Sequence, residues 1–148
     1  MKTISVIIPT LNEAASIETT LKAIKGQEWQ DGTFGVIVVD GGSTDGTRDI
    51  AARYARVIES KGGRAVQMNT GAAHADGDIL LFLHADTVLP QGAFAEITRA
   101  LKIPGVAAGF FRLRFDIPHP FLRFLSLFTS FNWWWARYGD QGLFLTRK

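Results

Sequence analysis

Four apolar runs of strand length recur in the N-terminal part of the chain. They are TISVII at 3–8, GVIVVD at 35–40, RVIES at 56–60 and DILLFLHAD at 78–86. Their apolar residues are continuous rather than alternating, and continuous runs are typical of parallel strands that are covered on both faces. The chain is therefore expected to fold around a parallel sheet of the α/β class.

Helical segments separate these runs. Residues 14–24 place Ile17, Leu21 and Ile24 on one face, with Asn12 available as an N-cap and Gly26 as a stop. Three more helices are expected, at 47–55, 64–75 and 91–102. This alternation predicts a Rossmann-like three-layer α/β/α sandwich with a mostly parallel central sheet and right-handed crossovers. We expect residues 1–148 to belong to one domain.

The composition excludes several classes of protein. The 148 residues include 16 Lys and Arg, 14 Asp and Glu, and no cysteine. A nucleic-acid partner would require a concentrated basic excess, so we expect none. A chain without cysteine forms neither disulfides nor a thiolate zinc site, which fits a reducing cytoplasm. The apolar run after Lys2 stops at Pro9 without a signal-peptide cleavage site, so we expect a cytoplasmic protein.

Residues 110–148 differ in composition from the rest. They contain 6 basic, 2 acidic and 12 aromatic residues, against 10, 12 and 5 in residues 1–109. We expect a half-exposed strand at 105–116, a helix rich in bulky residues at 121–138 and a last strand at 142–147. The rings of 121–138 could pack in the core or an oligomer interface, line an acceptor cleft, or rest peripherally on a membrane.

Polar clusters follow each of the four expected strands. They read PTLNE at 9–13, DGGSTDGT at 40–47, SKGGR at 60–64 and HADT at 84–87. Open parallel sheets bind their ligands at the carboxyl ends of the strands, where the strand order reverses. These clusters are therefore the candidate site.

The cluster at 40–47 suits a nucleoside. Asp40 can accept hydrogen bonds from a base or ribose, and Gly41 and Gly42 let a flat group approach the backbone. Residues 43–45 can cap the helix that is expected from residue 47. A capped turn without a ligand is the alternative interpretation.

The cluster at 84–87 suits a divalent cation. His84 and Asp86 are two residues apart, so both would project from one side of a strand. Asp86 and the oxygens of a diphosphate could hold the cation, with His84 as a second ligand or a hydrogen-bonding neighbour. The alternative is a histidine satisfied at a strand end and an aspartate that caps the next helix.

Together these clusters resemble a known family. SVIIPTLNE at 5–13, VIVVDGGSTDGT at 36–47 and the segment 62–87 that ends in HADT resemble the nucleotide-sugar-binding half of family 2 glycosyltransferases, which have a GT-A fold. The chain is most similar to the bacterial rSAM/selenodomain-associated transferase 2 subgroup, which also shows YGDQG, at 138–142 here. The resemblance covers the whole chain.

The resemblance implies roles for individual residues. His84-Ala85-Asp86 takes the place of the family's D-x-D motif, whose last aspartate holds Mn²⁺ or Mg²⁺ against the donor diphosphate. Asp40 would bind the base, residues 41–43 the adjoining nucleoside, and Arg64 the base from the other side. The remaining donor-binding residues implied are Pro9, Thr10, Asn12, Glu13 and Ala85.

The chain departs from the family pattern in two places. His84 replaces the first D-x-D carboxylate, so the cation would rest on Asp86 and the phosphates. No adjacent acidic pair follows Asp86, although such a pair usually supplies the base of an inverting transferase. Asp140 is the candidate base within the chain, or else a residue that binds acceptor, donor sugar or metal.

Two functions from different classes follow. The first is a metal-dependent, inverting transfer of a sugar from a nucleotide diphosphate to an acceptor hydroxyl, which in this family is often lipid-linked. Residues 1–109 would bind the donor and 110–148 would begin the acceptor side, at the inner face of the membrane if 121–138 contacts lipid. The second is a catalytically incomplete nucleotide-sugar-binding domain that acts with a partner or with a missing C-terminal segment.

Overall fold

The strands and helices follow one another as the apolar runs predict. The computed structural model describes residues 1–111 and 142–147. Its strands are β1 (Lys2–Thr10), β2 (Gly32–Asp40), β3 (Arg56–Glu59), β4 (Ile79–Phe82), β5 (Ala108–Phe110) and β6 (Leu143–Thr146). Its helices are α1 (Ile17–Lys25), α2 (Thr47–Ala51), α3 (Arg64–Ala73) and α4 (Ala93–Ala100). The predicted α/β class is confirmed.

One six-stranded sheet joins the strands in the order β3-β2-β1-β4-β6-β5. Its first four strands are parallel, whereas β6 runs antiparallel to both β4 and β5. The mostly parallel sheet and the last strand at 142–147 are therefore confirmed. Of the strand predicted at 105–116, Ala108–Phe110 forms β5, and residues 112–116 lie outside the described ranges.

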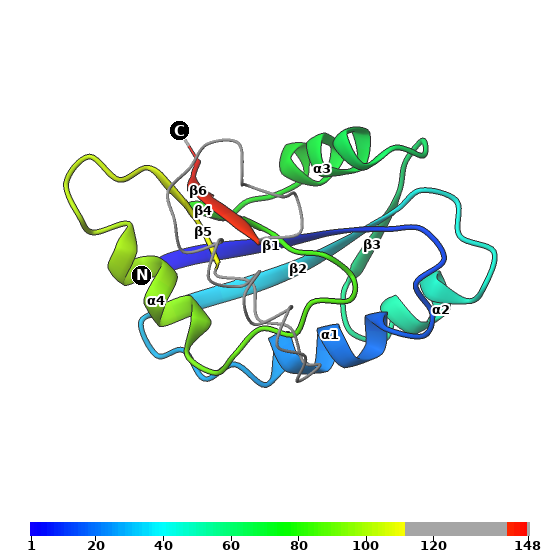
Figure 1. The fold of residues 1–148 in the computed structure, drawn as a ribbon, viewed down its shortest axis with the longest axis horizontal. Coiled ribbons are helices and arrows are strands. Elements are labelled where there is room, and N and C mark those ends of the chain that lie inside the picture. The colour runs from blue at the N-terminus through cyan, green and yellow to red at the C-terminus, as the bar shows by residue number, and fades with distance from the viewer. Residues whose placement is uncertain (112–141, 148) are drawn as a thin grey trace, which may run out of the picture.

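Helices cover both faces of the sheet. In Figure 1, α3 lies on one face and α1, α2 and α4 lie on the other. Val6 of β1 is buried in a cluster with Leu21 of α1 and Phe94 of α4, whereas its neighbour Ile7 is buried with Val39 on the face of α3. Successive strand residues point to opposite faces, so a strand covered on both sides is apolar throughout. The three-layer α/β/α sandwich is confirmed.

Helix α1 begins later than the sequence predicts. It starts at Ile17, after an N-cap at Ser16, instead of at residue 14, and it ends at Gly26 as expected. Asn12 is not its N-cap: its backbone is left-handed, with φ at 56°, and its side chain bonds to another loop. The helices predicted at 47–55, 64–75 and 91–102 are present as the shorter α2, α3 and α4.

Strand β4 ends earlier than predicted, at Phe82 rather than at residue 86. The next residues form a turn that is closed by a hydrogen bond from the Thr87 N–H to the His84 carbonyl (3.2 Å). The expectation that His84 and Asp86 project from one side of a strand is therefore wrong, because both belong to a loop. Among the described helices, none has the length and apolarity needed to cross a bilayer.

Candidate functional site

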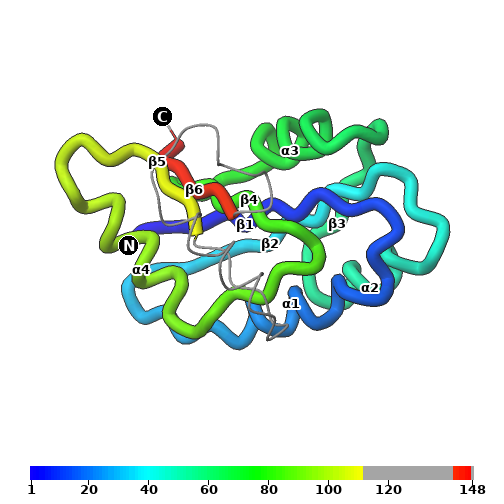
Figure 2. Tube along the Cα trace, in the orientation of Figure 1, coloured from blue at the N-terminus to red at the C-terminus, as the bar shows by residue number. Residues whose placement is uncertain are grey.

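The candidate site lies at the carboxyl edge of the parallel strands. Thr10 at the end of β1 pairs with Asp40 at the end of β2, and Asp40 pairs with Glu59 of β3. The chain passes from β1 outward to β3 and then returns to the other side of β1 as β4, so the strand order reverses between β1 and β4. Figure 2 shows the loops after β1 and β2 together at the end of the sheet away from the N-terminus. The predicted clusters therefore meet at the switch point of the sheet, where such folds bind ligands.

Asp40 is a buried carboxylate, with 1% of its surface exposed. One oxygen, Oδ2, accepts hydrogen bonds from the N–H groups of Gly42 and Ser43, both at 2.9 Å. The other, Oδ1, accepts from the hydroxyls of Ser43 and Thr10. Burial by itself raises the pKa of Asp40, but the hydrogen bonds from Ser43, Gly42 and Thr10 outweigh it and hold this pKa below its ordinary value. Asp40 is thus an ionised group that organises the loop following it.

The loops after β1 and β2 are bonded to each other through Asn12. The Asn12 N–H donates to the Ser43 hydroxyl (2.9 Å), and the Asn12 side-chain oxygen accepts from the Thr44 N–H (2.9 Å). The left-handed backbone of Asn12 is one that asparagine tolerates better than most residues. This reciprocal pair of hydrogen bonds holds the two loops in one register.

A second connection between these loops centres on Asp45. Its oxygens accept the N–H groups of Ala14 and Thr47, both at 3.0 Å, and the Thr47 hydroxyl accepts the N–H of Glu13 at 2.8 Å. The hydrogen bond from the Thr47 hydroxyl, followed by that from Ala14, lowers the pKa of Asp45. Of the residues expected to cap α2, Asp45 does bind its first N–H, whereas Ser43 and Thr44 bind the loop after β1 instead.

The loops after β3 and β4 meet through Arg64 and His84. Arg64 opens α3, and its guanidinium contacts Nε2 of the His84 imidazole. Arginine only donates hydrogen bonds, so the imidazole nitrogen is the acceptor in this contact. The same nitrogen is therefore engaged by a cationic side chain rather than held open for a metal ion.

Asp86 is exposed, and within the described ranges no hydrogen bond or ion pair engages its carboxylate. Ala85 beside it is buried, and its carbonyl accepts the Thr20 hydroxyl of α1 at 2.8 Å. Among the residues that the structure describes, no group of three or more His, Asp or Glu side chains could hold a metal ion. Asp86 suits a hard cation that takes most of its ligands from phosphate and water, as Mg²⁺ does.

Gln67 of α3 is a site residue that the sequence analysis missed. Its side chain is buried, and Nε2 donates to the carbonyls of Thr10 (2.7 Å) and Val39 (2.8 Å), the ends of β1 and β2. The sequence contains one signal for this position of Gln67. Gly71 lies one helical turn later on the same face of α3, and a glycine there allows that face to pack closely against the sheet. A Cβ at Gly71 would lie 2.3 Å from Ile7 Cγ2, so α3 presses against the sheet there.

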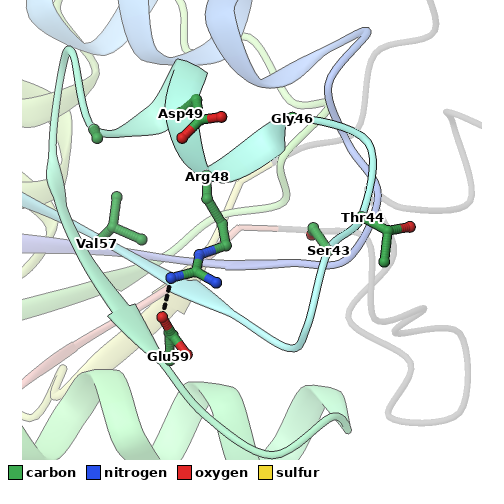
Figure 3. Close-up of a pocket in the computed structure, with 8 residues that line it drawn as sticks. Ser43, Thr44, Gly46, Arg48, Asp49, Val57 and Glu59 are labelled. Atoms are coloured by element: carbon green, nitrogen blue, oxygen red, sulfur yellow. Dashed lines mark hydrogen bonds and ion pairs between the residues drawn. The ribbon is translucent and has the colours of Figure 1, made fainter.

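A hollow of about 410 Å³ borders the loop after β2. Figure 3 shows Ser43 and Thr44 at one side of it and the ion pair between Arg48 and Glu59 at the other. Three of its lining residues, Ser43, Thr44 and Gly46, thus belong to the loop between β2 and α2. Asp140 and residues 121–138 lie outside the residues that the structure describes, so their predicted roles have no geometry here.

Comparison with known proteins identifies the family. The family model described as "Glycosyl transferase family 2" matches residues 5–147. An uncharacterized glycosyltransferase of Mycobacterium tuberculosis is 33% identical over 144 residues, which cover 84% of this chain and 53% of that protein. The chain thus spans about half the length of this curated relative.

Solved structures share the fold. The mannosyltransferase PcManGT from Pyrobaculum calidifontis, in complex with GDP-Man and Mn²⁺, aligns with a TM-score of 0.70 and 28% identity over 96% of this chain and 44% of its own. Glucosyl-3-phosphoglycerate synthase from Mycobacterium tuberculosis, in complex with UDP, aligns at 0.68 with 26% identity over 98% of this chain and 57% of its own. The sheet described above is therefore a GT-A fold. The chain belongs to glycosyl transferase family 2.

Proposed function

We propose that the chain is the donor-binding part of a glycosyltransferase that moves a sugar from a nucleotide diphosphate to an acceptor hydroxyl with inversion. The observation that carries the proposal is the pair of loops bonded together around the ionised Asp40, at the edge where Arg64 and Asp86 also lie. Structural relatives bound to GDP-Man with Mn²⁺ and to UDP support it.

The nucleoside would lie against the loops after β1 and β2. Both oxygens of Asp40 are already hydrogen-bonded, so this residue would act partly through the loop that it organises, with residues 41–43 facing the nucleoside. Arg64 is exposed at the start of α3, where its guanidinium would face the base or the diphosphate. The other residues that we propose to line the pocket are Pro9, Thr10, Asn12, Glu13 and Ala85.

We propose Asp86 as the carboxylate that holds Mn²⁺ or Mg²⁺. Bound there, the cation would supply Lewis-acid stabilisation of the charge that develops on the leaving diphosphate. His84 would act as the hydrogen-bonding neighbour rather than as a second ligand, because its Nε2 contacts Arg64. In this proposal, Asp86 would lie at the diphosphate through the cation, and Arg64 would reach the base or the diphosphate from the start of α3.

Residues 110–148 would form the beginning of the part that binds the acceptor. We propose Asp140 as the base that deprotonates the acceptor hydroxyl, and residues 121–138 as the surface for the acceptor, for a second copy of the chain or for peripheral contact with the inner face of the membrane. The composition of this part, with 12 aromatic and 6 basic residues, supports a lipid-linked acceptor.

A second function is a nucleotide-sugar-binding domain that acts with a partner or with a further segment. The absence of an adjacent acidic pair after Asp86 favours it. It predicts metal-dependent donor binding without turnover, so that Asp140→Asn changes nothing catalytic. The first function predicts that the same variant abolishes transfer while donor binding persists.

Titration calorimetry with UDP and GDP, with Mn²⁺ and with EDTA, tests the proposal. Asp86→Asn should remove the metal-dependent part of the affinity, and Asp31→Asn, at another exposed aspartate before β2, should leave it unchanged. Donor turnover is then measured with UDP- and GDP-sugars. The proposal fails if the wild-type chain binds neither diphosphate in the presence of Mn²⁺.

A further inference from the structure

Gln67 lies at the junction of three elements. Its N–H donates to the Gly63 carbonyl (3.0 Å) in the first turn of α3, and its side-chain amide bonds to the last residue of β1, Thr10, and to the next-to-last residue of β2, Val39. Only 4% of its surface is exposed. An unpaired buried polar group costs about 1–3 kcal/mol, so the two hydrogen bonds that this amide donates stabilise the junction.

The Gln67 amide also meets the loop after β2. A Cβ on Gly41 would lie 3.0 Å from Gln67 Nε2, so the glycine backbone rests against the amide group. Gly41 itself donates its N–H to the Thr10 carbonyl (2.9 Å), the same oxygen that accepts from Gln67. The amide therefore fixes the point at which the chain leaves β2 and enters the loop of Asp40.

Gln67 is three residues after Arg64 in the same helix. An α-helix is stiff over one turn, so a side chain that anchors its first turn to the sheet also sets the place of the residue that opens it. The described contacts thus link Arg64 at the start of α3 with Asp40 at the end of β2 through a single buried side chain.

We infer that Gln67 is a positioning residue for the donor site. It touches no donor atom, and it acts by holding the start of α3, with Arg64, at a fixed place relative to the Asp40 loop. The inference rests on the proposed function, since it assigns the way in which that same site is kept in shape. It also predicts that the loop loosens without Gln67 whether or not a nucleotide binds.

Gln67→Met tests this inference, because methionine keeps the length of the side chain and removes both donated hydrogen bonds. Gln27→Met is the matched control. Gln27 is also buried, but it follows the C-terminal end of α1, and its side chain donates to the Pro90 carbonyl (2.9 Å), shortly before α4, rather than to the ends of β1 and β2. Both variants should lower the melting temperature, and only Gln67→Met should change the donor site.

The readouts are the Kd for UDP and GDP with Mn²⁺ and the hydrogen exchange of the Gly42 and Ser43 amides in the free protein. Gln67→Met should weaken nucleotide binding about tenfold and speed exchange of these amides, and Gln27→Met should do neither. Gln67→Glu keeps one hydrogen-bond donor when its carboxyl group is protonated. At low pH its nucleotide affinity and its amide exchange rates should therefore lie between those of wild type and Gln67→Met. This variant takes the place of Gln67→Met if that protein does not fold.

Each outcome decides a different point. Unchanged exchange at Gly42 and Ser43, or an equal loss of affinity in both variants, would overturn the positioning role. If the wild-type chain binds no nucleotide, the proposed function fails by itself. Faster exchange of the loop in Gln67→Met would then still establish that Gln67 organises this edge of the sheet.

Discussion

The guanidinium of Arg64 and the Nε2 atom of His84 contact each other, and this contact joins the start of α3 to the loop after β4. His84 occupies the sequence position where the resemblance implies a metal-binding carboxylate. Its observed partner is a cation, and a nitrogen that accepts a hydrogen bond from arginine has no lone pair left for a metal ion. A role of His84 as a metal ligand can therefore be distinguished by experiment from a role as the hydrogen-bonding partner of Arg64.

Replacement of His84 by alanine tests them. We expect about fivefold weaker binding of UDP or GDP in EDTA, because Arg64 loses a contact that helps to orient it. The Mn²⁺ affinity of the nucleotide complex, measured by electron paramagnetic resonance, should stay unchanged. His74→Ala is the control, since His74 is exposed at the other end of α3. A selective loss of Mn²⁺ affinity in His84→Ala would instead make His84 a ligand.

A double-mutant cycle refines the same prediction. If His84 acts through Arg64, Arg64→Ala and the double variant Arg64→Ala/His84→Ala should bind nucleotide equally weakly. Additive losses would mean that the two side chains contact the ligand independently. Calorimetry of the four proteins at one salt concentration measures the coupling.

Asp40→Asn should destabilise the fold by about 2–3 kcal/mol, because one amide oxygen replaces a carboxylate that accepts four hydrogen bonds. The amide NH₂ group would replace one of the two accepting oxygens, either the one that faces the Ser43 and Thr10 hydroxyls or the one that faces the N–H groups of Gly42 and Ser43. Urea unfolding at pH 7 measures the loss. Asp76→Asn, at an exposed position, should change the free energy of unfolding little.

The same pair of variants predicts a pH dependence. The pKa of Asp40 is depressed in the folded protein, so its stabilising effect is complete above the ordinary value of 3.8 and is lost as the pH falls below it. The difference in unfolding free energy between wild type and Asp40→Asn should therefore shrink from pH 5 to pH 3. A difference that stays constant across this range would show that folding does not shift the pKa of Asp40.

The fold could be predicted because burial on both faces favours continuous apolar runs in strands, and β1, β2 and β4 contain such buried runs. The site could be predicted only as a set of loops. Which polar group bonds to which depends on the register of β1 against β2, and that register places Thr10 beside Asp40. Asparagine is a common N-cap residue, yet Asn12 does not cap α1. It forms hydrogen bonds with the loop after β2 instead.

Asn12 offers a test of the bond between the two loops. Asn12→Ala removes the acceptor for the Thr44 N–H and places an alanine in a left-handed backbone, whereas Asn12→Gly removes the acceptor alone. We expect losses of about 2 kcal/mol for alanine and about 1 kcal/mol for glycine in chemical denaturation. Equal losses would indicate that the backbone at residue 12 relaxes.

Gly71 tests the close packing of α3 that brings Gln67 to the sheet. A Cβ at this position would lie 2.3 Å from Ile7 Cγ2, too close for any real contact, so Gly71→Ala should cost about 2–3 kcal/mol. Gly35→Ala is the control, because a Cβ there meets nothing within 4 Å. Both losses are measured by urea unfolding.

A substitution at Ile7, the residue that a Cβ on Gly71 would strike, tests this packing further. Ile7→Ala removes the atom that a Cβ on residue 71 would strike, at the cost of a cavity in the buried face of β1. In the double variant Ile7→Ala/Gly71→Ala the new methyl group fills part of that cavity, so the combined loss should be smaller than the sum of the single losses. Additive losses would show that α3 shifts away from the sheet. Gln67 would then also lose its contacts with Thr10 and Val39, and nucleotide affinity should fall in Gly71→Ala as it does in Gln67→Met.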